Sequence, residues 1–405
     1  MRILYLHQYF NTPHLSGATR SYEMARRLAA AGHEVHMITS SRYISEKNKH
    51  WIYKMIEGIH VHRIFIPYSN KMGFGERIFS FFRFSWEASK KIIQIKGDVV
   101  YATSTPLTIA VPAIAAKMRH RVPMVFEVRD LWPELPIAVG ALRNPFSRML
   151  AGLLEWLAYH ASAHVIALSP GMAAGVKKRG ISSPRVSVIP NGCDVELFDV
   201  PAEKGEWVRR QLGLVPDQPL VVYTGAFGMI NGVGYLVDTA AAMRDIAPQV
   251  RFLLAGSGAE KDKVSAKAER LGVLNKNLWI WPPQPKAKVP GILAASTVAV
   301  SLFISLEQMW SNSANKFFDA LAAGKPVAIN YGGWQAGILR KSGAGIVLPP
   351  DDPKRAASRL AEFIHEPERL KRAASASRRL ARGQFNRDLS YEKLENVLQN
   401  AAAKR

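Results

Sequence analysis

Short apolar runs alternate with amphipathic stretches along both halves of this 405-residue chain, and this alternation limits the fold more than any other feature. In the first half, strands are expected at residues 3–7, 34–39, 60–65, 98–102, 124–128, 164–168 and 186–189. In the second half, they are expected at 220–224, 251–255, 278–281, 298–302, 327–329 and 345–348. Strands separated by helical segments favour parallel sheets covered by helices. The sequence therefore predicts an α/β protein with two doubly wound units.

A strong turn signal, Pro190-Asn191-Gly192, separates the two halves. We therefore expect one domain over residues 1–190 and another over 191–384, each long enough to bury its own core. A final helix over about 385–405 either belongs to the second domain or packs back on the first. Ligands of open α/β sheets bind beyond the carboxyl ends of the strands, so the candidate site is expected there.

The net charge of +22 is the strongest compositional feature. Residues 1–190 carry 25 Lys and Arg against 11 Asp and Glu, so the excess favours the first half. Such a field attracts nucleic acid, anionic lipid or phosphorylated substrates. Cys193 is the single cysteine, which excludes an internal disulfide and a cysteine metal cluster. No signal peptide or membrane-spanning window is evident, so we expect a cytoplasmic or surface-bound chain.

The segment 311–329 reads as a polar loop, a short helix, a glycine stop and a buried strand. Lys316 and Asp319 lie three residues apart and so share one face of this helix. The start of a helix attracts an anion, and Lys316 adds a full charge. Asp319 can accept hydrogen bonds from sugar hydroxyls. These features predict a site for a diphosphate with an attached ribose; the alternative is a capped helix with a local ion pair, ended by Gly324.

A basic and aromatic segment at residues 71–96 is a candidate membrane contact. Phe79, Phe82, Trp86 and Ile93 follow helical spacing, as in a helix that lies in a bilayer interface. The alternative is a helix whose aromatic side chains fill the core of the first domain. Nucleic acids bind similar residue types, but no nucleic-acid module is present, so no such partner is expected.

Several segments, in their order and spacing, resemble bacterial family 4 glycosyltransferases of the GT-B fold, near the branch that builds O-antigen and capsule sugars. They are residues 16–20, 127–134, 189–194, 223–225, 254–258 and 390–391. The resemblance implies two Rossmann-like domains facing across a cleft, the first binding the acceptor and the second a nucleotide sugar. It also implies retaining transfer from a UDP-sugar, of the hexosyl or N-acetylhexosaminyl type, without a metal.

The resemblance assigns roles to residues in the first domain. Gly17 occupies the position of a glycine that approaches the donor diphosphate, although an ordinary strand-to-helix turn would also explain it. Asp130 is the first candidate for orienting the acceptor hydroxyl, and Glu134 the second. Arg129 stands where many relatives carry a histidine, and it could grip a phosphate or pair with either acid.

The second domain departs from the family pattern at the diphosphate. Relatives often carry Gly-Arg followed by Lys-Gly, whereas this chain has Gly225-Ala226 and Asn231-Gly232. Because both cations are missing, the phosphate charge is expected to fall on Lys316, on backbone donors or on arginines of the first domain.

The acid–seven residues–acid pattern of the family is also altered. Ser311 stands at the first acid position and Asp319 at the second, with Glu307 as a nearby stand-in. Trp281 opens the loop expected to hold the nucleotide base, where it either stacks on the base or packs in the core. The remaining candidate donor contacts are Gly225, Asn231, Gly256, Lys286 and Asn315.

These features together predict transfer to a lipid-linked, polyprenyl-diphosphate saccharide during surface polysaccharide synthesis. The enzyme would work peripherally on the anionic inner face of the cytoplasmic membrane. Two alternatives stay open: a nucleotide-sugar epimerase of the same architecture, and a non-catalytic basic protein that binds membrane or nucleic acid.

Overall fold

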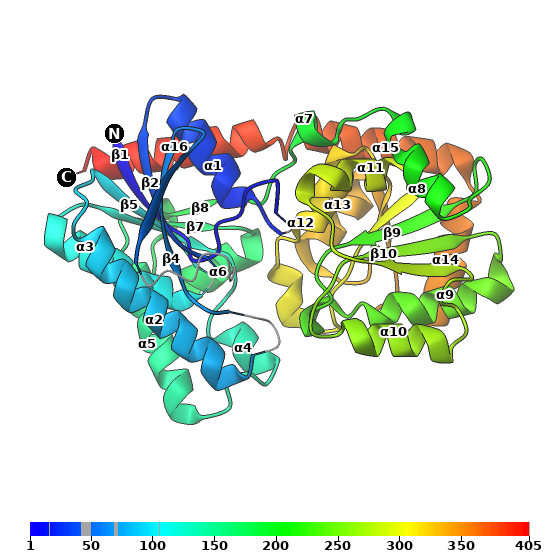
Figure 1. Cartoon of the computed structure of the whole chain (residues 1–405), viewed down its shortest axis with the longest axis horizontal. Helices are drawn as coiled ribbons and strands as arrows, with labels where there is room; N and C mark the ends of the chain where they lie inside the picture. Colours follow the sequence, from blue (N-terminus) through cyan, green and yellow to red (C-terminus); the bar gives the residue numbers. More distant parts are fainter. Residues whose placement is uncertain (16, 42–49, 69–71, 105, 405) are drawn as a thin grey trace. The chain divides into compact units, whose positions relative to one another are not determined.

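The structure, a computed structural model, describes residues 1–15, 17–41, 50–68, 72–104 and 106–404. The chain divides into two compact units (Figure 1). Unit 1 comprises Met1–Thr12, Thr19–Pro190 and Ser390–Arg405, and unit 2 comprises Pro13–Ala18 and Asn191–Leu389. The short segment Pro13–Ala18, placed in the first domain by the sequence analysis, thus groups with unit 2. Ser16 and Lys71, the first residues of the segments 16–20 and 71–96 named above, lie outside the described residues.

Unit 1 is built on an eight-stranded sheet in the order β3-β4-β2-β1-β5-β6-β7-β8. Its strands are β1 Arg2–Leu6, β2 Glu34–Ser41, β3 Ile52–Ile56, β4 Ile59–Phe65, β5 Val99–Thr103, β6 Met124–Val128, β7 His164–Ala167 and β8 Val186–Val188. All neighbours pair in parallel except β3, which pairs antiparallel with β4. This edge strand was not predicted, because its middle residues are exposed and form no buried apolar run.

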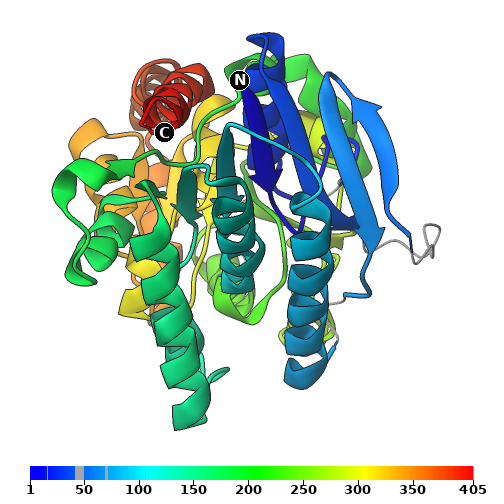
Figure 2. The same ribbon diagram turned by 90° about the vertical axis from the view of Figure 1, so that its left-hand side faces the viewer.

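Helices cover both faces of this sheet. They are α1 Arg20–Ala30, α2 Phe74–Ile92, α3 Ala110–His120, α4 Glu134–Ala138, α5 Pro145–Ala161, α6 Pro170–Lys178 and, crossing from unit 2, α16 Arg387–Ala402. One apolar cluster joins the sheet to α2, α3 and α5, and includes Phe84, Phe126 and Tyr159. A second joins the opposite face to α1 and α16 through Leu28 and Leu398. Figure 2 shows α2, α3 and α5 side by side.

Unit 2 is built on a six-stranded, fully parallel sheet in the order β11-β10-β9-β12-β13-β14. Its strands are β9 Leu220–Thr224, β10 Arg251–Ala255, β11 Leu278–Trp281, β12 Val298–Ser301, β13 Val327–Ile329 and β14 Gly345–Val347. Its helices are α7 Val195–Phe198, α8 Glu206–Gln211, α9 Gly234–Ile246, α10 Lys261–Arg270, α11 Val289–Ala294, α12 Asn315–Ala322, α13 Gly333–Ser342, α14 Pro353–Ile364 and α15 Pro367–Arg382. The predicted α/β class with two doubly wound units is confirmed.

A fully buried ion pair lies in the centre of unit 1. Glu127, on β6, accepts hydrogen bonds from Arg20 at 2.7 and 3.0 Å and from the hydroxyl of Tyr101 at 2.6 Å. Arg20 also donates to the carbonyl oxygens of Ile189 and Pro190 at 3.0 and 2.6 Å. Burial would raise the pKa of Glu127, but the charge of Arg20 outweighs it and lowers this pKa to about 2. The pair fixes the start of α1 against Ile189 and Pro190, where the segment Thr19–Pro190 of unit 1 ends.

We expect Glu127→Gln to lower the free energy of unfolding of unit 1 by about 3 kcal/mol, because it leaves Arg20 buried without a counter-ion. Urea unfolding followed by circular dichroism measures this loss. Because the folded pKa lies below the ordinary value of 4.5, the stabilisation is present above about pH 4.5 and is lost as the pH falls toward 2.

The control is Glu206→Gln, which removes a solvent-exposed pair with Arg210. Exposed pairs contribute little, so the unfolding midpoint should stay unchanged in this variant. Equal effects of the two substitutions would contradict a structural role for the buried pair.

Candidate functional site

The ammonium group of Lys316 lies at the carboxyl edge of the sheet in unit 2. Lys316 is the second residue of α12, and its Nζ donates to Oδ1 of Asn231 at 3.1 Å. Asn231 ends a short 3₁₀ turn, η5 Met229–Asn231, and is buried. The same ammonium lies 5.3 Å from the ring centre of Tyr223 on β9. Burial lowers the pKa of Lys316 to about 8, and the charge of Asp319 opposes this shift.

Two glycines at the ends of β9 and β10 shape the space beside this lysine. Gly225 follows β9 with φ of +146°, and a Cβ atom there would lie 2.3 Å from Cε of Lys316. Gly256 follows β10, and a Cβ atom there would lie 1.8 Å from the carbonyl oxygen of Gly225. The missing side chain of Gly225 therefore leaves space for Lys316, and that of Gly256 allows the close approach of the Gly225 backbone. That these glycines also contact a phosphate stays a prediction.

Asp319 lies one turn further into α12 and pairs with Lys286. The Nζ of Lys286 donates to both carboxylate oxygens at 2.6 Å, and both residues are buried. The bonded partner of Asp319 is therefore Lys286, and the expected local pair with Lys316 is not the principal contact. Sequence spacing could not reveal this, because the partners are 33 residues apart. The carboxylate keeps further lone pairs for sugar hydroxyls.

The segment that carries Gly17 contacts the residues beside this ion pair. The backbone N–H of Lys286 donates to the carbonyl oxygen of Leu15, and that of Ala287 to the carbonyl oxygen of Pro13, each at 3.4 Å. Gly17 is exposed and has φ of +125°, a conformation that favours glycine. Its predicted approach to a diphosphate stays a prediction.

The remaining predicted donor contacts flank α12 and β11. Ser311 ends the 3₁₀ turn η7 Glu307–Ser311, and Asn315 is the half-buried first residue of α12. Glu307 is exposed. Trp281 is half-buried and stacks on Trp207 with ring centres 5.7 Å apart. The interpretation of Trp281 as a packed core residue is therefore wrong; the partner from α8 holds it near the surface.

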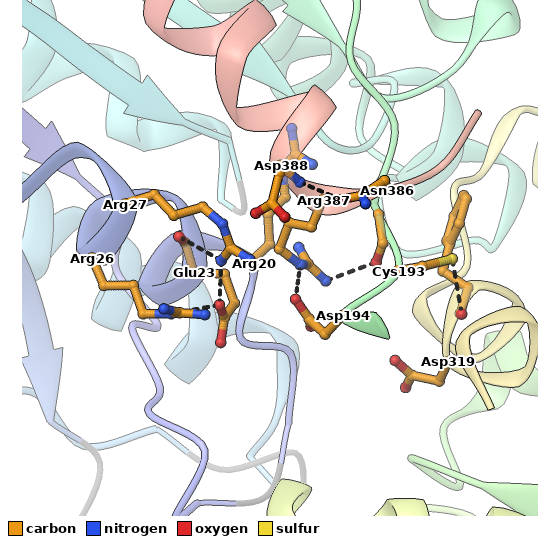
Figure 3. Close-up of polar contacts among 12 residues, drawn as sticks. Arg20, Glu23, Arg26, Arg27, Cys193, Asp194, Asp319, Asn386, Arg387 and Asp388 are labelled. Carbon is orange, nitrogen blue, oxygen red and sulfur yellow. Dashed lines mark hydrogen bonds and ion pairs between the residues drawn. The ribbon is translucent and has the colours of Figure 1, made fainter. Parts of the chain in front are cut away.

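The chain segment that enters unit 2 is bonded to the loop before α12. Asn191 donates from its side chain to the carbonyl oxygen of Ser313 at 2.6 Å, and its N–H donates to Oγ of Ser313 at 3.2 Å. Arg387 pairs with Asp194 and donates to the carbonyl oxygen of Gly192 at 2.8 Å (Figure 3). These contacts fix the position from which α12 starts, and sequence reasoning had assigned them no role.

Cys193 supports the same region. Its thiol, which is buried, donates to the carbonyl oxygen of Phe318 on α12 at 3.2 Å (Figure 3). Burial raises the pKa of this thiol well above its ordinary value. Cys193 is therefore a structural thiol.

In unit 1, Arg129 and Asp130 directly follow β6 at the carboxyl edge of the sheet. The N–H of Arg129 donates to Oγ of Ser104 at 2.9 Å, and its guanidinium donates to Nε2 of His7 at 3.4 Å. His7 follows β1, so the carboxyl ends of β1 and β6, which flank β5 in the sheet, bring an imidazole beside Arg129. Sequence reasoning missed His7, whose only signal was its position at the end of the first expected strand.

Glu134 begins α4 and pairs with Arg179 at 2.9 Å. Arg179 also lies 2.8 Å from the buried Glu155. Burial, together with the like charge of Glu134, raises the pKa of Glu155 to about 7. The alternative in which Arg129 pairs with Glu134 is therefore wrong, because the partner of Glu134 is Arg179. The catalytic roles of Arg129, Asp130 and Glu134 stay predictions.

Among the described residues, no group of three His, Cys, Asp or Glu side chains is arranged to hold a metal ion. The predicted metal independence of the reaction is not tested by this observation.

Comparisons with known proteins identify the class. The family model "Glycosyltransferase Family 4" matches residues 17–197, and the model "Glycosyl transferases group 1" matches residues 206–380. The Anabaena protein HepE, solved in complex with UDP and glucose, superposes with a TM-score of 0.74 at 18% identity over 99% of this chain and all of its own. The fold is therefore that of GT-B glycosyltransferases.

The chain belongs to family 4 of the glycosyltransferases, since the two models together cover most of it. It is 28% identical over 264 residues to a D-inositol 3-phosphate glycosyltransferase of Segniliparus rotundus, a match that covers 63% of this chain but only 56% of that relative. It is 24% identical over 303 residues to a putative colanic acid biosynthesis glycosyl transferase of Escherichia coli, covering 70% of this chain and 72% of the relative.

We expect Gly225→Ala to weaken UDP binding at least about tenfold, because the new methyl group would displace Lys316 and strain a backbone with positive φ. Isothermal titration calorimetry with UDP measures the change. The matched control is Gly337→Ala on α13, where an added Cβ has no neighbour within 4 Å. Unaltered UDP affinity in Gly225→Ala would show that the position of Lys316 is unimportant for the nucleotide.

Proposed function

We propose that this chain is a retaining glycosyltransferase that moves a sugar from a UDP-sugar to a lipid-linked, polyprenyl-diphosphate saccharide in surface polysaccharide synthesis. Unit 2 would bind the donor and unit 1 the acceptor, without a metal. The observation that carries the proposal is Lys316, whose ammonium lies at the carboxyl edge of a parallel sheet above a glycine and beside the first turn of α12. An anion is expected at such a position.

The chemistry follows from the charge that develops during transfer. When the bond between the sugar and the diphosphate breaks, negative charge grows on the departing phosphate. A fixed cation and backbone N–H groups aimed at that charge stabilise the transition state. In this proposal Lys316 and the start of α12 perform this task, while Asp319, held by Lys286, accepts hydrogen bonds from the ribose.

Asn231 has a different role from the lysine that many relatives carry at this position. Its amide oxygen is an acceptor, so it binds the ammonium of Lys316 and cannot donate to a phosphate through that atom. The residue thus fixes the remaining cation instead of adding a second one. Lys316 would then carry more of the diphosphate charge than any other side chain of unit 2.

On the acceptor side, Asp130 is proposed to orient the attacking hydroxyl and Arg129 to hold an acceptor phosphate. His7 lies beside Arg129 and supplies the imidazole that the position of Arg129 itself lacks. The lipid-linked acceptor is supported by the relative described as a colanic acid biosynthesis enzyme, and by the basic excess of residues 1–190. Other relatives are described as a D-inositol 3-phosphate glycosyltransferase and an alpha-maltose-1-phosphate synthase, so a soluble phosphorylated acceptor is the alternative substrate.

Incubation of the chain with radiolabelled UDP-sugars, with and without polyprenyl-diphosphate saccharides, tests the proposal. We expect label in the lipid fraction, with the anomeric configuration of the donor preserved. Lys316→Met should lower transfer about 100-fold, as expected for loss of a charge contact to the leaving group. Its control is Lys325→Met, which removes a half-buried lysine that donates to the carbonyl oxygens of Ala294 and Ser296.

The other outcomes point to other functions. Formation of an epimerised UDP-sugar in the absence of an acceptor would identify an epimerase. Transfer only to inositol phosphates or sugar phosphates would show that the acceptor is a soluble phosphorylated compound and not a lipid-linked saccharide. If calorimetric titration of the wild-type chain with UDP shows no binding, a non-catalytic binding protein would be favoured.

A further inference from the structure

Helix α5 presents a continuous apolar face to solvent. Six large apolar side chains recur at helical spacing on it, so they lie along one side of the helix. They are between 40% and 61% exposed: Phe146, Met149, Leu150, Leu153, Trp156 and Leu157. The opposite side of α5 packs into the core through Ala158 and Tyr159. α5 is therefore apolar on both sides, and one of these sides has no protein packed on it among the described residues. An exposed apolar surface of this kind indicates a contact with a lipid bilayer or with another molecule.

The exposed apolar surface continues over the two neighbouring helices. α3 contacts both α5 and α2, and the three helices lie side by side on one face of the sheet (Figure 2). α3 adds the exposed Val111 and Met118, and α2 with its C-cap adds Phe79, Phe82, Trp86 and Ile93. The interpretation that these α2 side chains fill the core is thus wrong for the three aromatic residues, although Phe84 does so. We call this set of twelve side chains the apolar docking face.

The charges near this face have mainly one sign. The single acid of α3 and α5 is Glu155, which is buried and bonded within unit 1. The acids of α2 are Glu76 and Glu87. Basic residues of the three helices and their ends include Arg83, Lys90, Lys91, Lys117, Arg119, Arg121, Arg143 and Arg148. An apolar face with basic surroundings is complementary to a bilayer that carries anionic headgroups.

Two tryptophans on the face support this partner. Trp86 lies under the ammonium of Lys90, 5.0 Å from the ring centre, and Trp156 stacks on His160 at 4.2 Å. Tryptophans of this amphipathic kind are enriched at the level of the lipid headgroups. No described helix is both long and apolar enough to cross a bilayer.

We infer that α5 is a membrane-inserting element, its apolar side buried in an anionic leaflet while α2 contributes aromatic anchors and cations. A second copy of the chain fits less well, because a symmetric contact would oppose the same basic residues without exposed acids from α3 or α5 to pair with them. The inference rests on the membrane partner of the proposed function and adds the helix that would contact the lipid. It concerns lipid alone, so vesicle binding can be measured whether or not UDP binds.

Vesicle sedimentation with a double variant tests the role of α5. Leu150→Gln/Leu153→Gln should weaken binding to phosphatidylglycerol–phosphatidylcholine vesicles at least about tenfold. Both side chains are about half exposed, so circular dichroism and thermal unfolding should match the wild type. The matched control is Val215→Gln/Ile246→Gln, two exposed apolar residues of unit 2, which should leave binding unchanged. Equal binding of both double variants would overturn the inference.

A fluorophore on a single cysteine measures insertion directly. Leu153→Cys can be labelled selectively, because Cys193 is buried. We expect a blue shift and increased intensity of the label with anionic vesicles, and none for a label at Val215→Cys. Absence of the shift would contradict insertion. A shift that depends on protein concentration without vesicles, with a change in sedimentation coefficient, would identify a second copy as the occupant and also overturn it.

Discussion

The placement of one ammonium group governs the candidate donor site. The Nζ of Lys316 donates a hydrogen bond to the amide oxygen of Asn231 and lies over the ring of Tyr223. The lysine side chain passes over Gly225, where the missing side chain leaves the required space. Burial lowers its pKa to about 8, so the group carries most of its charge at neutral pH but is poorly solvated. A partly buried cation of this kind gains from an anionic ligand, because the ligand restores the electrostatic stabilisation that water would have provided.

The surroundings of Lys316 depend on contacts between segments that are distant in the sequence. Asn191 bonds to Ser313 before α12, and Cys193 bonds to Phe318 within α12. Arg387 in turn holds the 192–194 segment through Gly192 and Asp194. The chain where it enters and leaves unit 2 is therefore tied to the helix that carries Lys316 and Asp319. A substitution in these segments should disturb the site without touching a ligand.

The sequence predicted elements better than contacts. Parallel strands buried on both faces are continuous apolar runs, so every strand except β3 was predicted to within a residue or two. Edge strand β3 lacks such a run because its middle residues face solvent. The pairing of Asp319 with Lys286 and the approach of His7 to Arg129 arise from tertiary packing, which spacing along the chain does not encode. The apolar face of α5 was overlooked since an apolar helical stripe ordinarily indicates a core contact.

The central claim, that Lys316 is the principal cation of unit 2 for a nucleoside diphosphate, is tested most directly by proton uptake. Calorimetric titration with UDP at pH 8, in buffers of different ionisation enthalpy, counts the protons taken up on binding. Since the diphosphate favours the charged ammonium, the account predicts uptake of about half a proton by the wild type. It predicts none for Lys316→Met and wild-type uptake for Lys325→Met. Binding without uptake, or equal uptake in Lys316→Met, would contradict the account.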